Sequence, residues 1–84
     1  MKNFYVQLTS IEDVKQFNAA ACDTAFDVDI VSGRYVIDAK SIMGLFSLDL
    51  ARPIRVDARG DDAGAEGFYR KVESLVVEGP PEKK

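Results

Sequence analysis

Apolar and polar side chains alternate over residues 26–31, which predicts a β-strand with one buried face. Phe26, Val28 and Ile30 alternate there with Asp27, Asp29 and Val31. A period of two places the three apolar residues on one side of a sheet. The turn residues Ser32-Gly33-Arg34 follow, and Tyr35-Val36-Ile37 is rich in strand formers. Together these segments predict a β-hairpin.

Two further segments alternate in a similar way and predict two more strands. The first contains Phe4, Val6 and Leu8 and ends at Thr9-Ser10, and the second contains Ile54, Val56 and Ala58. The second strand begins after Pro53, which cannot continue a preceding helix. Each of these strands therefore also presents one apolar face.

Three other segments have the spacing of amphipathic helices. Ser10 and Asp13 resemble a capping box for the first helix, whose buried face is expected to contain Ile11, Val14, Phe17 and Ala21. Ser41 can cap a short second helix that carries Ile42, Met43, Leu45 and Phe46. The third helix is expected from about Asp62, with an apolar stripe of Ala65, Phe68, Tyr69, Val72, Leu75 and Val76.

The order of these elements is β-α-β-β-α-β-α, which predicts an α+β fold. One polar and one apolar face on each strand fit an open-faced β-sandwich, an antiparallel sheet covered on one face by helices. A chain of 84 residues has room for one domain. We expect that domain to span residues 1–78 and to be followed by a flexible tail over residues 79–84, which contains two prolines and two terminal lysines.

Charge and cysteine content exclude several classes of function. The formal net charge is −3 and the isoelectric point about 4.8, which argues against nucleic-acid binding because that function needs a clustered basic surface. No apolar run approaches membrane-spanning length or resembles a secretory signal. The single Cys22 cannot form an internal disulfide, so a cytoplasmic protein is expected. Cys22 is interpreted as a small buried residue rather than a reactive thiol.

No arrangement of residues indicates an enzyme, a metal site or a cofactor. Asp27 and Asp29 share a strand face, but with no histidine in the chain they are better interpreted as solvated carboxylates than as metal ligands. Arg55 and Arg59 are candidate partners for them across neighbouring strands. The glycines between Gly60 and Gly67 lack the lysine-serine pair of a phosphate loop. We therefore expect no catalytic residue.

The segment from Asp38 to Leu48, DAKSIMGLFSL, resembles the regulatory-serine segment of the HPr family of the phosphoenolpyruvate-dependent sugar phosphotransferase system. Residues 26–77 are similar to the second half of that family throughout, and the order of the elements is also the same. The resemblance implies the HPr-like open-faced sandwich. In that strand order, the strand of Ile54 lies beside the strand of Asp29.

The same resemblance implies a regulatory site. A serine at the position of Ser41 is phosphorylated by an ATP-dependent HPr kinase in this family, and the residues around it help to form a docking surface. The corresponding partner-binding residues here are Lys40, Ile42, Met43, Phe46 and Leu48. The implied partners are that kinase and a transcriptional or sugar-transport regulator. Leu50 adds to an apolar set that is too large for one narrow stripe, so Met43 and Phe46 are expected to be exposed.

The chain departs from the family where phosphoryl transfer takes place. Ser10 stands at the position of the active histidine, and Glu12 and Asp13 follow it. A serine phosphate is a stable ester, and the carboxylates disfavour a phosphate at the helix start. The chain is therefore similar to histidine-lacking relatives with a role in catabolite repression, and it is not expected to be a phosphocarrier.

Two functions remain open from the sequence. In the first, the chain is a regulatory binding module that is switched by phosphorylation of Ser41. In the second, Ser41 only caps its helix, and the chain is a constitutive structural or interaction protein that uses Met43 and Phe46, with self-association as one use of that surface.

Overall fold

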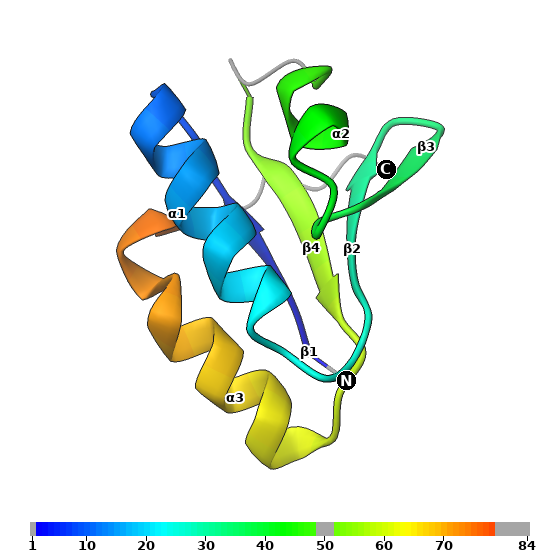
Figure 1. Cartoon of the computed structure of the whole chain (residues 1–84), viewed down its shortest axis with the longest axis vertical. Coiled ribbons are helices and arrows are strands. Elements are labelled where there is room, and N and C mark those ends of the chain that lie inside the picture. The colour runs from blue at the N-terminus through cyan, green and yellow to red at the C-terminus, as the bar shows by residue number, and fades with distance from the viewer. Residues whose placement is uncertain (1, 49–51, 79–84) are drawn as a thin grey trace.

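The computed structural model describes residues 2–48 and 52–78, and these residues form an α+β fold (Figure 1). The described part contains five strands, three α-helices and one short 3-10 helix. In chain order these are β1 (Lys2–Val6), α1 (Ile11–Cys22), β2 (Val28–Ser32), β3 (Tyr35–Asp38), α2 (Ile42–Phe46), β4 (Ile54–Ala58), α3 (Asp62–Lys71), η1 (Glu73–Leu75) and β5 (Val76–Val77).

The strands form one antiparallel sheet in the order β3-β2-β4-β1-β5. β4 pairs on both of its sides, so that Val56 lies opposite Phe4 of β1 and opposite Ile30 of β2. Residues that lie directly opposite each other share a face of the sheet. The apolar sets predicted from the sequence therefore meet on one face, while Asp29, Arg55 and Asp57 lie on the other.

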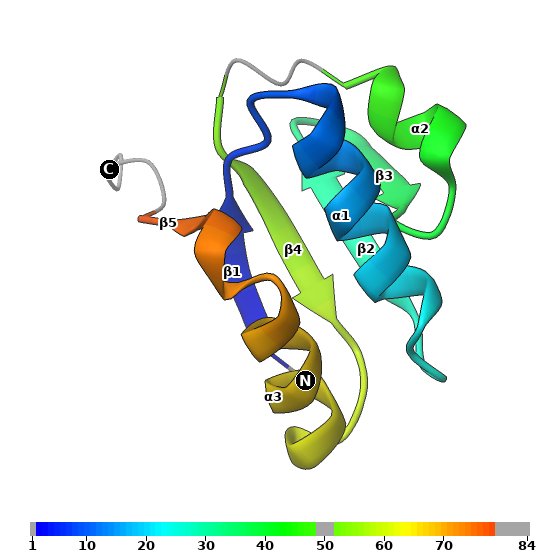
Figure 2. The same cartoon turned by 60° about the vertical axis from the view of Figure 1, so that its left-hand side comes forward.

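The helices cover only the apolar face, as Figures 1 and 2 show from two directions. Val6, Ile30 and Val56 are fully buried beneath them. Phe17 of α1 and Phe68 of α3 meet edge to face above the sheet, with ring centroids 5.8 Å apart. The predicted sheet with helices on one face is confirmed.

Side-chain caps begin all three α-helices, two of them as predicted. Ser10 accepts a hydrogen bond from the amide of Asp13 at 3.1 Å, and Ser41 accepts one from Gly44 at 3.2 Å. Asp61 caps α3 by accepting a bond from Gly64 at 2.8 Å. Each bond satisfies an amide that the first turn of a helix leaves without a partner.

The predicted hairpin is confirmed, with Ile30 opposite Ile37 and Ser32 opposite Tyr35. Gly33 has a φ of +60°, and no other described residue has a positive φ. A glycine with positive φ in the first position of a two-residue loop is typical of a type II′ turn, which suits the twist of the strands.

Two predicted strand boundaries are wrong, and one strand was missed. β2 begins at Val28, so Phe26 and Asp27 lie in the loop before it. β1 ends at Val6, and Leu8 is buried beyond the strand. β5 was not predicted. It pairs Val76 with Val6 of β1, so the chain continues as a strand where a helix was expected.

Two predicted features of the helices are also wrong. α3 ends at Lys71, and Leu75 is buried from η1 instead of from the expected helix. Ile11 was expected on the buried face of α1, but its side chain is 63% exposed because the packed part of that helix begins one turn later, at Val14.

The described elements run from Lys2 to Val77, and the domain bounds of residues 1–78 stay a prediction. The predicted tail over residues 79–84 lies outside the described residues. Within the described ranges, no helix has the length and apolar character needed to cross a membrane.

Candidate functional site

Ser41 lies in a tight turn between β3 and α2 and is exposed. Its amide donates to the carbonyl of Asp38 at 2.9 Å, and the carboxylate of Asp38 accepts a bond from the amide of Lys40 at 2.9 Å. The hydroxyl of Ser41 is the cap of α2. The turn is thus held by hydrogen bonds on both sides of the serine.

The short helix α2 packs closely on the sheet because of one glycine. A Cβ atom at Gly44 would come 2.7 Å from the Cγ2 of Ile37 on β3, which is closer than van der Waals contact allows. Glycine therefore lets the first turn of α2 approach β3. This approach fixes which side chains of the helix face outward.

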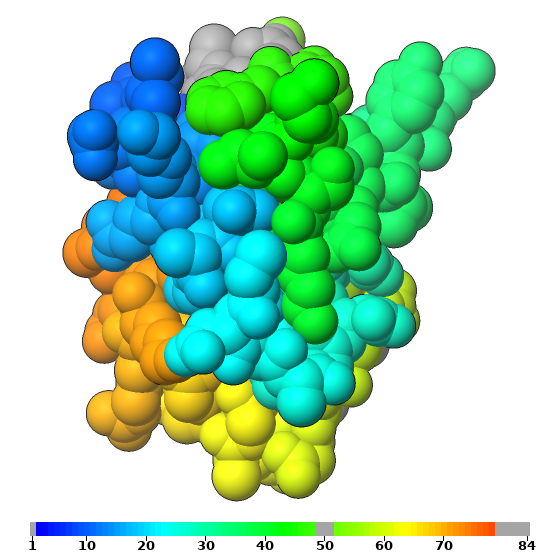
Figure 3. Space-filling view, in the orientation of Figure 1, coloured from blue at the N-terminus to red at the C-terminus, as the bar shows by residue number. Residues whose placement is uncertain are grey.

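The outward side chains are those of Met43 and Phe46, which are 79% and 47% exposed. Leu45 is fully buried on the opposite side, and Ile42 and Leu48 are half-buried against the core. We use the term α2 surface for Ser41, Met43 and Phe46, and Figure 3 shows α2 on the outside of the molecule. Ile42 and Leu48, predicted to bind a partner, contribute mainly to packing. Leu50 lies outside the described residues.

The segment before Ser41 is anchored to the end of α1. Asn18 donates to the carbonyl of Ala39 at 3.1 Å, and the ammonium of Lys40 donates to the carbonyl of Thr24 at 3.2 Å. Lys40 was predicted to bind a partner, but in the structure its charge is directed toward α1. The ammonium has two further N–H groups, so a partner's phosphate or carboxylate can accept a bond from it beside the one to Thr24.

Cys22 was expected to be buried, and this prediction is wrong. It is the last residue of α1 and is exposed, with its Sγ 3.7 Å from the carbonyl of Lys40 and 3.9 Å from Oδ1 of Asn18.

Ser10 is exposed at the start of α1, and the hydrogen-bond donors of the residue before it are already bonded to a carboxylate. The amide and the hydroxyl of Thr9 both donate to Oδ2 of Asp13 at 3.0 Å. These two bonds hold the pKa of the Asp13 carboxyl below its usual value, and the bond from the Thr9 amide has the larger effect. A carboxylate therefore already accepts the donors at the position that the resemblance aligns with the active histidine.

The structure does not bring Ser10 and Ser41 together as one site. α1 begins at the end of the molecule where α2 ends, so the two capping serines lie at opposite ends of the helix pair (Figure 1). Ile11, the first residue of α1, and Phe46, the last residue of α2, are both exposed. The sequence analysis missed Ile11 because its helical spacing assigned it to the core.

The expected charge pairs on the open face are present in part. Arg59 bonds Asp29 with Nε 2.7 Å from Oδ2, as predicted. Arg55 instead bonds Asp57 of its own strand, at 2.9 Å, and Asp57 is only 5% exposed. Asp27 lies before β2 and contributes its carbonyl to the amide of Arg59. The carboxylates of Asp29 and Asp57 are engaged by arginines and have the geometry of a structural cluster.

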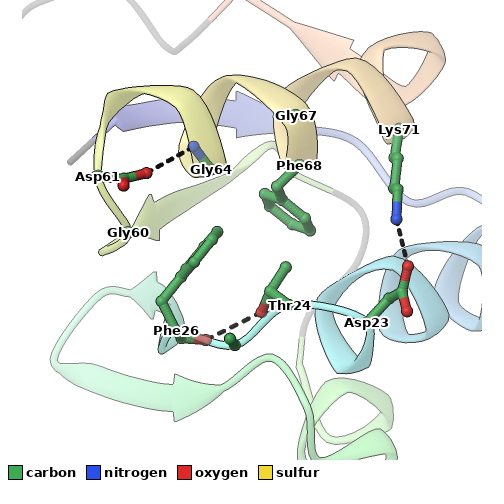
Figure 4. Close-up of a pocket in the computed structure, with 10 residues that line it drawn as sticks. Asp23, Thr24, Phe26, Gly60, Asp61, Gly64, Gly67, Phe68 and Lys71 are labelled. Carbon is green, nitrogen blue, oxygen red and sulfur yellow. Dashed lines mark hydrogen bonds and ion pairs between the residues drawn. The ribbon is translucent and has the colours of Figure 1, made fainter.

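A cavity of about 530 Å³ lies between the loop after α1, the turn after β4 and one side of α3 (Figure 4). Phe26 and Phe68 form its apolar walls, and Gly60, Gly64 and Gly67 also line it, with the ring of Phe26 close to Gly60 and Gly64. The sequence analysis did not predict it, since its lining residues come from three separate segments. The spacing of the three glycines was the only local signal.

The charged groups around this cavity already have partners. Lys71 forms an ion pair with Asp23. The hydrogen bond of this pair and, as the smaller cause, its charge attraction lower the pKa of the Asp23 carboxyl. Asp61 is the cap of α3. With its acids occupied in this way, the cavity offers an apolar recess and no paired acid and base for catalysis.

Comparison with known proteins adds no assignment. No protein-family model matches the chain, and no curated protein matches it either. The fold class and the geometry around α2 are therefore the basis for a functional proposal.

Proposed function

We propose that this chain is a regulatory interaction module with an HPr-like fold, in which a partner protein binds the α2 surface and phosphorylation of Ser41 controls that binding. One observation carries the proposal. Met43 and Phe46 stand exposed on a five-residue helix beside an exposed serine, while Leu45 of the same helix is fully buried. Exposed large apolar side chains that lie together are typical of protein-binding surfaces.

The arrangement of the sheet supports the HPr-like part of the proposal. β4 lies beside β2, which is the neighbour that the HPr-like strand order requires. The helices lie on one face, and the segment DAKSIMGLFSL forms the end of β3, the turn and α2. The segment that resembles the family thus occupies one continuous surface feature.

A phosphate on Ser41 would add about −1.5 to −2 charges beside the carboxylate of Asp38. The surrounding turn is fixed by the bonds of Asp38 and Gly44, so the added charge acts on a partner rather than by refolding the domain. A partner that presents arginine or lysine to the phosphate and an apolar groove to Met43 and Phe46 would recognise the modified form. An HPr kinase and a transcriptional or sugar-transport regulator in the cytoplasm fit this proposal.

A second function is favoured by the capping bond. The hydroxyl of Ser41 already accepts the amide of Gly44 at 3.2 Å, which is sufficient reason for a serine at this position. In that case the α2 surface binds a partner constitutively. Neither function assigns the chain a catalytic residue or a cofactor.

Intact-mass spectrometry after incubation with ATP and an HPr kinase tests the first proposal. Ser10→Ala is the matched control for Ser41→Ala, because both serines are exposed helix caps with a bond to an amide three residues later. We expect one added phosphate on the wild type and on Ser10→Ala, and none on Ser41→Ala. An unmodified wild type, under conditions that modify ordinary HPr, would overturn the switch and favour constitutive binding.

Calorimetric titration with a purified catabolite-control regulator tests the binding surface. Phosphorylated wild type should bind, whereas unphosphorylated chain and the phosphorylated double variant Met43→Gln/Phe46→Gln should not. Because both side chains are exposed, the double variant should keep its unfolding midpoint, which separates lost binding from lost folding. Unchanged binding by the double variant would place the partner elsewhere.

A further inference from the structure

The outer edge of β3 has no partner strand within the described part of the chain. β3 is the last strand of the sheet on its side and bonds only to β2. Tyr35 and Val36 on this strand are 71% and 64% exposed. Figure 3 shows the hairpin of β2 and β3 standing out beyond α2. An exposed apolar edge strand is a template for pairing with another strand.

The register of the hairpin determines which backbone groups face outward. A two-residue loop closes on a hydrogen-bonded pair, here Ser32 and Tyr35. Because bonded and non-bonded pairs alternate in an antiparallel ladder, Ile37 also bonds to β2 and Val36 does not. The amide and the carbonyl of Val36 are therefore directed away from the sheet, ready to bond to a neighbour.

The sequence of this edge is complementary to itself when read in the opposite direction. If two copies of β3 pair in antiparallel fashion around Val36, then Val36 lies opposite Val36, Tyr35 opposite Ile37, and Arg34 opposite Asp38. The central pair is of the hydrogen-bonded kind that the outward groups of Val36 require. An aromatic residue then faces a β-branched one, and opposite charges face each other at both ends.

The two charged residues are available for this contact. Arg34 and Asp38 are exposed, and neither takes part in an ion pair among the described residues. Asp38 uses one carboxylate oxygen, Oδ1, for the amide of Lys40, which leaves its other oxygen for an arginine. Each dimer would contain this ion pair twice.

We propose that β3 pairs with β3 of a second copy of this chain around a two-fold axis at Val36, which joins the two sheets into one. The axis is perpendicular to the sheet, so the helices of both copies lie on the same side of the joined sheet. Arg34, Val36 and Asp38 alternate with Tyr35 and Ile37 and lie on the side away from the helices. This interface differs from the α2 surface and does not depend on phosphorylation of Ser41.

Charge exchange provides the test, with the association state measured by sedimentation velocity over a range of concentrations. The wild type should form a dimer as concentration rises. Arg34→Asp alone and Asp38→Arg alone each place like charges opposite one another, and each should raise the dissociation constant at least about tenfold. An equal mixture of the two variants should associate again, because each acidic edge then faces a basic one. The double variant Arg34→Asp/Asp38→Arg should also dimerise.

Restoration in the mixture is the decisive result, because a variant that merely disturbs the hairpin would not regain association on mixing. Circular dichroism of each single variant checks that the fold is intact. A wild type that stays monomeric at every concentration, or a mixture that stays monomeric while the wild type dimerises, would overturn the proposal. Dimerisation lost in Met43→Gln/Phe46→Gln but kept in the charge variants would place self-association on the α2 surface instead.

Cross-linking tests the register independently. In a Cys22→Ser background, Val36→Cys would place two thiols on strands whose Cα atoms are about 5.5 Å apart, within the range of a disulfide. Mild oxidation should give a covalent dimer with Val36→Cys and much less with Ala19→Cys, a position on α1 that is also exposed. Equal cross-linking at the two positions would indicate random collision and contradict the proposed pairing.

Discussion

Asp29 and Asp57 lie directly opposite each other on β2 and β4, and Arg59 contacts both carboxylates. The guanidinium Nε is 2.7 Å from Asp29, and a terminal nitrogen is 3.8 Å from Asp57. Like charges at opposite positions of a sheet repel each other. Arg59 offsets this repulsion, and its bond and attraction to Asp29 raise the pKa of the guanidinium itself. Arg59, together with Arg55 at 2.9 Å from Asp57, thus permits two aspartates to occupy paired positions.

Replacing Arg59 by glutamine should therefore reduce stability more than removal of an ordinary surface arginine. Arg59→Gln leaves the two carboxylates facing each other, and Asp57 is nearly buried. Arg70→Gln is the control, since Arg70 is 73% exposed in a surface pair with Glu66. Urea unfolding followed by circular dichroism should give a lower midpoint for Arg59→Gln and an almost unchanged one for Arg70→Gln. Equal midpoints would contradict the role given to Arg59.

Replacing glycine by alanine should stabilise the protein at Gly67 of α3 and destabilise it at Gly60, in the turn before that helix. A Cβ at Gly67 meets no other atom within 4 Å, whereas one at Gly60 lies 2.4 Å from the ring of Phe26. Gly67→Ala should gain about 1 kcal/mol of helix propensity, which raises the melting temperature by roughly 4–8 °C for a domain of this size. Gly60→Ala should lower it. Thermal unfolding of both variants checks the pair, and a rise of the melting temperature in both would show that the ring of Phe26 moves freely.

The ionisation of Asp13, in the first turn of α1, should make the free energy of unfolding depend on pH. Its pKa is lowered in the folded state by the Thr9 amide and hydroxyl, so its ionised form stabilises the fold. That contribution is complete above the unfolded pKa of about 3.9 and is lost as the pH falls through the lower folded value. Asp13→Asn should therefore flatten the dependence of the unfolding free energy on pH between about 2 and 5.

Glu12→Gln is the control for this pH dependence. Glu12 lies in the same turn, and its side chain makes no hydrogen bond within the described residues. Urea titrations at several pH values should give wild-type slopes for Glu12→Gln. A slope that is flattened equally in both variants would mean that the overall charge of the turn, and not the bonds from Thr9, sets the effect.

The sequence predicts best the features that depend on neighbouring residues. The turn at Gly33 and the caps at Ser10 and Ser41 follow from local backbone chemistry, and the structure has all three. The exposure of Met43 and Phe46 followed from an excess of apolar residues over what a short helix can bury.

Features that depend on distant segments could not be predicted in this way. Ile11 has the helical spacing of a core residue, but nothing packs over the first turn of α1. Asp57 is nearly buried because the sheet register and its two arginines cover it, and a strand pattern carries no such information. The residues Val76–Val77 continue a helical stripe in sequence, yet they pair with β1 at the other end of the chain.

The central place of β4 has a consequence for synthesis. β1 begins at residue 2, but its partner β4 begins only at Ile54. The β2–β3 hairpin also pairs with β4, so neither can complete its pairing before β4 is made. A nascent chain whose residues up to Ala58 have not yet left the ribosome therefore holds an unpaired β1 and a β2–β3 hairpin without its neighbouring strand. Because such long-range pairing forms late, this is the stage at which the chain is most prone to aggregate and has the greatest need of a chaperone.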